Sequence, residues 1–214
     1  MKLKDPVSSI THYIGLGLTI IFGIPLIIKG FGAGTKNGIT LIIFIVGMAL
    51  LYMASGTYHA ISSTQTINRV LKKLDHCMIF VLIASSYTPI CIVSIGTRKS
   101  FFLLVLIWFI ALSGICLKLF IVYHPKWISS VLYISMGWLC IFLVIDIYKA
   151  LNLIGFIFLV LGGILYTIGG VIYALKLKVF NSKHKYWGSH EIFHIFVMCG
   201  SLCHYIVMWT NIAV

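Results

Sequence analysis

Histidines in two distant parts of the chain have the types and spacing of a metal site. His190 and His194 are four residues apart in the segment Ser189-His-Glu-Ile-Phe-His194. On a helix this separation places both imidazoles on one face, about 6 Å apart along the axis, so both can reach one ion. A third imidazole from a facing helix, His59, would leave the fourth position open, as catalytic zinc sites do. The sequence therefore predicts a zinc site at His59, His190 and His194.

Asp75 is the residue expected to act beside that ion. It begins the next apolar segment after His59, and Ser55 precedes His59 by one helical turn. A carboxylate can accept a proton from water or hold a ligand imidazole, and for Asp75 both roles stay open.

The remaining histidines fit a metal site less well. His204 shares a face with His194, but ten residues place it about 15 Å farther along the helix, so a hydrogen bond or a pore-mouth role is expected there instead. His12 is an outside candidate for the site. His76 points about 100° away from Asp75 on a helix, and His124 and His184 fall in loops.

The segment from His190 to His194 also has the H-E-x-x-H pattern of zinc metalloproteases, in which the glutamate is the general base. A membrane-embedded protease of this kind takes its third ligand, typically an aspartate, from a later helix. No aspartate follows His194 in this sequence, so the pattern disfavours a protease.

The composition requires a membrane around these residues. Of 214 residues, 61% are hydrophobic and 9% charged, with a mean hydropathy of +1.09. Such a chain is typical of an integral membrane protein and excludes a soluble enzyme, a disordered chain and a secreted disulfide scaffold. The net charge of +12 is expected to mark cytoplasmic loops, with no nucleic acid and no soluble protein partner implied.

The apolar stretches predict an all-α protein with seven transmembrane helices in one domain, residues 1–214. Each stretch is long enough to cross the roughly 30 Å hydrocarbon layer. Glycines recur at seven-residue spacing in the sixth, as Gly162, Gly163, Gly169 and Gly170, which predicts close helix packing. The stretches are about 9–28, 39–60, 75–95, 101–123, 128–146, 152–175 and 190–210.

Basic residues predict the orientation of the bundle. Eleven of the sixteen Lys and Arg residues lie at the N-terminus or in the loops that follow the second, fourth and sixth stretches. The other five lie in the loops on the opposite side of the membrane. Because basic loops stay in the cytoplasm, the N-terminus is expected inside and the C-terminus outside. In that topology the predicted ligands, Asp75 and Ser55 all lie near the cytoplasmic face. The loop charges do not depend on where the histidines lie, so the predicted topology and the predicted metal site support each other.

Several motifs together resemble the haemolysin III branch of the progestin and adipoQ receptor family. They cover essentially the whole chain. The matching motifs are Ser9-Ile-Thr-His12 with Gly15, Ser55-x-x-x-His59, Leu74-Asp75, Ser189-His190-Glu-Ile-Phe-His194 and Cys203-His204.

The resemblance implies a seven-helix protein of the bacterial plasma membrane, with its N-terminus inside. It implies a zinc ion held by three histidines near the cytoplasmic face, matching His59, His190 and His194, with Ser55 and Asp75 beside it. The adiponectin-receptor branch is similar to ceramidases, which implies a membrane lipid amide or ester as substrate. That branch has Gln at the position of Glu191, which argues against Glu191 as an essential base.

Three functions remain open at this stage. The leading hypothesis is a membrane-embedded zinc hydrolase acting on a lipid amide or ester. In it Asp75 is expected to shuttle the proton, and Ser55 to hydrogen-bond the water or the developing oxyanion. The second is a haemolysin or channel that causes cytolysis, although a chain this hydrophobic cannot readily leave one cell to attack another. The third is a sensor or receptor in which the zinc is structural.

Overall fold

The computed structural model describes residues 3–120, 126–175 and 188–214. Within these ranges the regular structure is helical, and seven helices are long and apolar enough to cross a membrane. The predicted all-α fold with seven transmembrane helices is therefore confirmed. The α-helices are α1 (Pro6–Ala33), α2 (Thr35–Ala60), α3 (Gln65–Pro89), α4 (Arg98–Phe120), α5 (Lys126–Trp138), α6 (Val144–Ala150), α7 (Leu153–Leu175) and α9 (Ser189–Asn211). A π-helical segment, Ile90–Ile95, continues α3 within the third span, and α5 and α6 together make up the fifth span, Trp127–Ala150.

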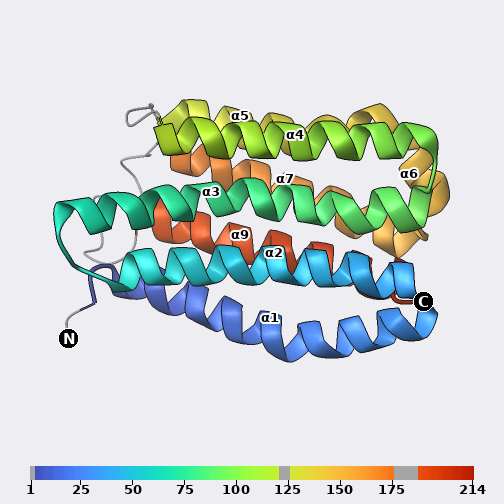
Figure 1. The fold of residues 1–214 in the computed structure, drawn as a ribbon, viewed down its shortest axis with the longest axis horizontal. Coiled ribbons are helices and arrows are strands. Elements are labelled where there is room, and N and C mark those ends of the chain that lie inside the picture. Colours follow the sequence, from blue (N-terminus) through green and yellow to red (C-terminus); the bar gives the residue numbers. More distant parts are fainter. Residues whose placement is uncertain (1–2, 121–125, 176–187) are drawn as a thin grey trace.

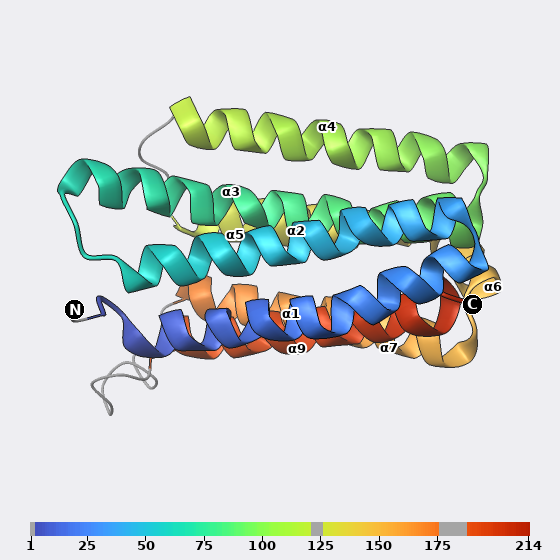
Figure 2. The ribbon, with the colours of Figure 1, turned by 60° about the horizontal axis from the view of Figure 1, so that its bottom comes forward.

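The helices form one elongated bundle (Figure 1). α2 packs between α1 and α3, α9 packs on α7 and returns to α1, and α5 contacts both α3 and α7. α4 packs on α3 and lies at the edge of the bundle (Figure 2). The two ends of the chain lie at opposite ends of the bundle (Figure 1), as an odd number of crossings requires. Which end faces the cytoplasm stays a prediction.

Large apolar side chains cover the outside of the bundle, whereas the interior holds polar side chains among apolar ones such as Phe44 and Phe80, because lipid solvates apolar surface and cannot satisfy polar groups. Ile21, Phe109 and Phe142 expose 63%, 67% and 77% of their surface. Ser9, by contrast, is buried and donates to the Gly56 carbonyl oxygen at 3.2 Å. The outside of the bundle is thus suited to lipid, and its interior can hold polar chemistry.

The third helix begins earlier than the sequence predicted. It starts at Gln65, where the Thr64 hydroxyl accepts a hydrogen bond from the Ile67 amide at 3.4 Å. The prediction that Asp75 opens this helix is therefore wrong, since Asp75 lies ten residues inside it. An apolar run marks where a helix enters hydrocarbon, whereas the helix itself begins at its cap.

The predicted fifth helix, 128–146, is interrupted. α5 ends at Trp138, a tight 3₁₀ segment covers Leu139–Leu143, and α6 follows. Tyr87 of α3 supports the break: its hydroxyl donates to the Gly137 carbonyl oxygen at 2.6 Å and accepts from the Cys140 amide at 2.9 Å. A side chain from another helix satisfies the freed backbone groups, which is why the local sequence did not predict the interruption.

Two of the α7 glycines allow α9 to approach closely. A Cβ atom on Gly162 would lie 2.6 Å from the His204 ring, and one on Gly169 would lie 2.8 Å from the Phe196 Cβ. The predicted close packing is confirmed at these positions. It fixes α9, and with it the segment from His190 to His194, against the rest of the bundle.

Candidate metal centre

The three predicted ligands come together at the end of the bundle where α2 ends and α9 begins. His59 lies in the last turn of α2, and His190 and His194 lie in the first two turns of α9. Their ligand nitrogens all lie within 4.8 Å of one another, and the Nε2 atoms of His59 and His190 are 3.0 Å apart. Two nitrogens bound to zinc at 2.1 Å in a tetrahedron are separated by about 3.4 Å. The group is therefore the right size to hold a small metal ion.

Asp5 is a member of this site that the sequence analysis missed. Its Oδ2 atom lies 3.0 Å from His59 Nδ1, and its amide donates to the His59 carbonyl oxygen at 2.9 Å. Because a carboxylate only accepts hydrogen bonds, His59 Nδ1 carries the proton and the lone pair of Nε2 faces the other histidines. Asp5 thus orients His59 as carboxylates orient metal-bound histidines in proteins.

A signal for Asp5 was present in the sequence. The chain has four acidic residues, and Asp5 directly precedes the first apolar stretch, at the same predicted depth as His59. A ligand histidine usually donates its second nitrogen to a carboxylate or carbonyl oxygen. From the sequence, holding a ligand histidine is one of the two roles expected of Asp75. In the structure Asp5 has this role at His59.

Lys4 brings a positive charge to the same corner. Its Nζ atom lies 3.9 Å from Asp5 Oδ2 and 3.6 Å from the centre of the Tyr58 ring. Partial burial lowers the pKa of Lys4 below its usual value, and the nearby Asp5 carboxylate opposes that shift. Lys4 therefore covers the outer side of the Asp5–His59 pair.

Asp75 and Ser55 lie next to the three histidines. Both are buried, with 7% and 1% of their surface exposed, and the Ser55 hydroxyl is close enough to interact with the Asp75 carboxyl group. A cavity of about 170 Å³ is lined by Asp75 together with His59 and His190. Asp75 thus shares this space with two of the candidate ligands, and the roles of Asp75 and Ser55 stay predictions.

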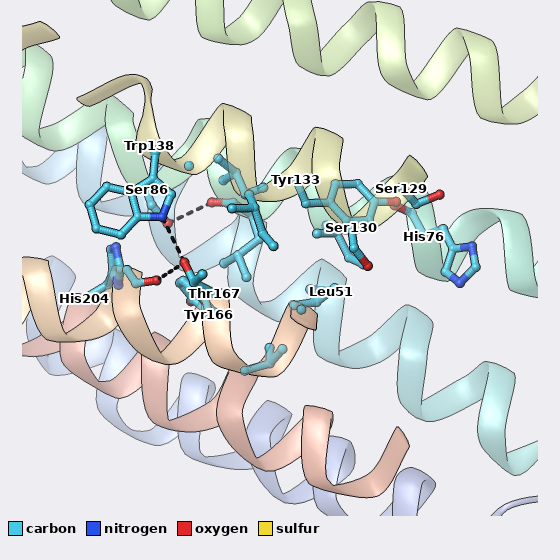
Figure 3. A pocket seen from close by; sticks show the side chains of 18 of the residues that line it. Leu51, His76, Ser86, Ser129, Ser130, Tyr133, Trp138, Tyr166, Thr167 and His204 are labelled. Atoms are coloured by element: carbon cyan, nitrogen blue, oxygen red, sulfur yellow. Dashed lines mark hydrogen bonds between the residues drawn. The ribbon is translucent and has the colours of Figure 1, made fainter. Parts of the chain in front are cut away.

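A second, larger cavity leads from this site into the bundle. Its volume is about 600 Å³, and His190, His194, Ser55 and Asp75 line one part of it. The rest of the wall is mostly apolar and comes chiefly from α3, α5 and α7; Figure 3 shows part of it, where Trp138 donates to the Thr167 hydroxyl at 2.9 Å. On α3 the lining begins with polar and basic residues, among them Arg69 and Lys72. From Asp75 it continues to Ile90, just after the end of α3, about 22 Å at 1.5 Å per residue.

The other described histidines lie outside the group of three candidate ligands. His204 is outside the three-histidine group, and its ring Nδ1 lies 2.9 Å from the Gly200 carbonyl oxygen, which confirms the expected hydrogen bond. His76 lines both cavities, and its carbonyl oxygen accepts from the Tyr133 hydroxyl at 2.9 Å. His12 is buried beside His194. His124 and His184 lie outside the described residues.

Glu191 serves the helix end instead of the site. One carboxylate oxygen accepts from the Gly188 amide at 2.8 Å, and the other accepts from the Ser8 hydroxyl at 3.0 Å. The first contact caps α9, and the second ties it to α1. With both oxygens engaged in this way, Glu191 is poorly placed to act as the base of a protease.

The chain is similar to known proteins along most of its length. The sequence profile described as "Haemolysin-III related" matches residues 1–205. The chain is 38% identical over 199 residues to "Hemolysin-3 homolog" of Bacillus subtilis (strain 168), covering 92% of this chain and 89% of that protein. It is 35% identical over 199 residues to "Hemolysin-3" of Bacillus cereus, covering 92% and 87%.

Proposed function

Because this chain belongs to the haemolysin III family, we propose that it is a zinc-dependent hydrolase embedded in the plasma membrane of a bacterium. Its substrate is a membrane lipid with an acyl amide or ester bond. The metal site lies near the cytoplasmic face, with the N-terminus inside and the C-terminus outside. The basic residues of the loops support this orientation.

One observation carries the proposal: the three-histidine group opens into a long, mostly apolar cavity. His190 and His194 belong both to the candidate ligand set and to the wall of the 600 Å³ space. A volume of this size is typical of a site for a small ligand. A single acyl chain spans about half of the 30 Å hydrocarbon layer, so the lining from Asp75 to Ile90 is long enough to receive one.

The residues of this chain divide the work of hydrolysis between them. When bound, zinc supplies a Lewis acid that polarises the acyl carbonyl and makes water more acidic. Asp75 accepts a proton from the attacking water and returns it to the leaving nitrogen or oxygen, as one C–O bond forms and the scissile bond breaks. Ser55 holds the carboxyl group of Asp75 in place or hydrogen-bonds the developing oxyanion.

The names of the relatives favour a second candidate, a haemolysin or channel that lyses membranes. The mostly apolar cavity supports a lipid ligand better than an aqueous pore. A third candidate is a sensor in which the zinc is structural. The buried Asp75 and Ser55 beside the histidines favour chemistry over a purely structural ion.

The test combines metal analysis with an assay of lipid hydrolysis. The full chain, purified in lipid nanodiscs, is expected to hold about one zinc ion and to release laurate from N-lauroylsphingosine or p-nitrophenyl laurate. His59→Ala should lose both properties. Cells that carry the parent chain should contain less of the substrate lipid and more free fatty acid than cells that carry His59→Ala. A protein that holds zinc, releases no laurate and lyses membranes equally well after His59→Ala would support the channel instead.

A further inference from the structure

His12 is a buried polar residue for which the proposed hydrolysis has so far given no role. It lies on α1 with 3% of its surface exposed. Its ring stacks on that of His194, with centroids 3.8 Å apart and planes 14° apart, and the edge of Tyr52 packs against it at 5.3 Å. Neither of its ring nitrogens has a hydrogen-bond partner among the described residues.

Such an arrangement is costly unless something else binds the nitrogens. A buried polar group left without a hydrogen bond destabilises a protein, because it has lost its bonds to water and gained none in return. Buried polar atoms in native proteins are therefore nearly always paired, and an exception indicates strain, a catalytic role, or a water, ion or ligand. Both nitrogens of His12 are in this position, although a hydrophobic residue would fill the same space without the cost.

His12 does not bind the ion proposed for His194. An imidazole binds a metal through a lone pair in its own ring plane, so two histidines that share an ion need planes that meet at the ion. The nearly parallel planes of the stacked rings meet only far from the site. In agreement, the group of nitrogens within 4.8 Å contains His59, His190 and His194 and does not contain His12.

A ligand in the large cavity could be the hydrogen-bond partner of His12, because His12 lines that cavity. His12 lines the 600 Å³ space together with Ser55, Asp75 and His194. A lipid whose acyl chain occupies the apolar part would place its carbonyl group here. A neutral imidazole has one N–H donor, and a carbonyl oxygen is an acceptor.

We infer that His12 donates a ring N–H hydrogen bond to the acyl carbonyl oxygen of the lipid and so helps to stabilise the oxyanion that forms there. This inference rests on the proposed function, and it adds a substrate-contacting residue on α1 to the residues of α2, α3 and α9. Stacking on His194 holds the ring in place. A fixed donor of this kind contributes most when it faces the atom on which charge develops.

The experiment uses His12→Phe, which keeps a flat ring and removes the donor, and His12→Gln, which restores an N–H. His12→Met, a flexible apolar replacement, is the second donorless variant in case the phenylalanine does not fit. Tyr52→Phe is the matched control, because the Tyr52 ring packs on His12 without lining the cavity. All forms are studied as the full chain in nanodiscs.

Three measurements are made on each form: zinc content, release of laurate from p-nitrophenyl laurate, and equilibrium binding of radiolabelled palmitate, whose carboxylate resembles the reaction product. We expect both donorless variants to keep the zinc and to lose kcat by a factor on the order of 10²–10³. Palmitate binding should weaken about five- to tenfold, as expected for one lost hydrogen bond. His12→Gln should recover part of both losses, and Tyr52→Phe should match the parent.

Each contrary result identifies what is wrong. Loss of zinc in the donorless variants would make His12 a ligand and overturn the inference. Parent-like hydrolysis and palmitate binding in those variants would overturn it while leaving the hydrolase standing. A parent that holds zinc, hydrolyses nothing and binds palmitate through His12 would overturn the hydrolase and leave the contact standing. A parent that neither hydrolyses nor binds either probe would overturn both.

Discussion

Removal of the Asp5 carboxylate should weaken metal binding although Asp5 does not touch the metal. The substitution is Asp5→Ala, with Asp5→Asn as the milder form. The hydrogen bond from the Asp5 amide to the His59 carbonyl oxygen, at 2.9 Å, does not depend on the side chain. The backbone before α1 therefore keeps its anchor, and the change affects mainly the 3.0 Å contact between Oδ2 and His59 Nδ1.

The size of the effect follows from that contact. A hydrogen bond to a charged group contributes about 1.5–3 kcal/mol. Because 42% of the Asp5 side chain is exposed and solvent screens its charge, we take the lower end, about 1.5 kcal/mol. That value corresponds to about tenfold weaker zinc binding in Asp5→Ala, the lower end of the 10- to 100-fold typical of such partners. Asp5→Asn keeps an acceptor and loses only the charge, so about threefold is expected.

Zinc affinity is measured by competition with a chelator on the purified protein in nanodiscs. Asp146→Ala is the control, because Asp146 lies in α6, near the opposite end of the bundle (Figure 1). It should bind zinc as the parent does. The reasoning is refuted if Asp5→Ala binds zinc as tightly as the parent. It is equally refuted if this variant loses zinc as completely as His59→Ala, since Asp5 would then be a ligand or essential to the fold.

Three further predictions concern the ligands, the base and the topology. Alanine at His59, His190 or His194 should lower zinc content sharply by metal analysis, whereas His204→Ala should not, because its ring lies outside the group of candidate ligands; the reverse pattern would contradict the depth argument. Asp75→Asn keeps the shape and loses the charge, so it should retain most of the zinc while laurate release falls by about 10²- to 10⁴-fold; complete loss of zinc would instead make Asp75 a ligand. Reporter fusions should place the C-terminus outside the cell, and a cytoplasmic C-terminus would contradict the basic-residue asymmetry.

The sequence alone determined the class of fold and the residues that could bind a metal. Seven apolar stretches predict seven helices because each crossing needs about 20 apolar residues, a requirement that every stretch meets locally. The spacing of His190 and His194 predicts a shared face, since helical geometry depends only on the distance along the chain. The order of the helices then predicts that His59 lies at the same depth in the bilayer as His190 and His194, and that His204 lies deeper along its helix. The haemolysin III motifs were likewise readable from the sequence.

The tertiary structure decided which groups complete the site. Asp5 and His59 are 54 residues apart, and His59 and His190 are 131 apart, so no local pattern encodes either contact. The stacking of His12 on His194 depends in the same way on how α1 packs against α9. Helix ends were predicted poorly where a cap or a distant side chain sets them, as at Thr64 and Tyr87. Hydropathy records the cost of each residue in lipid, whereas hydrogen bonds between helices depend on packing that only the folded chain creates.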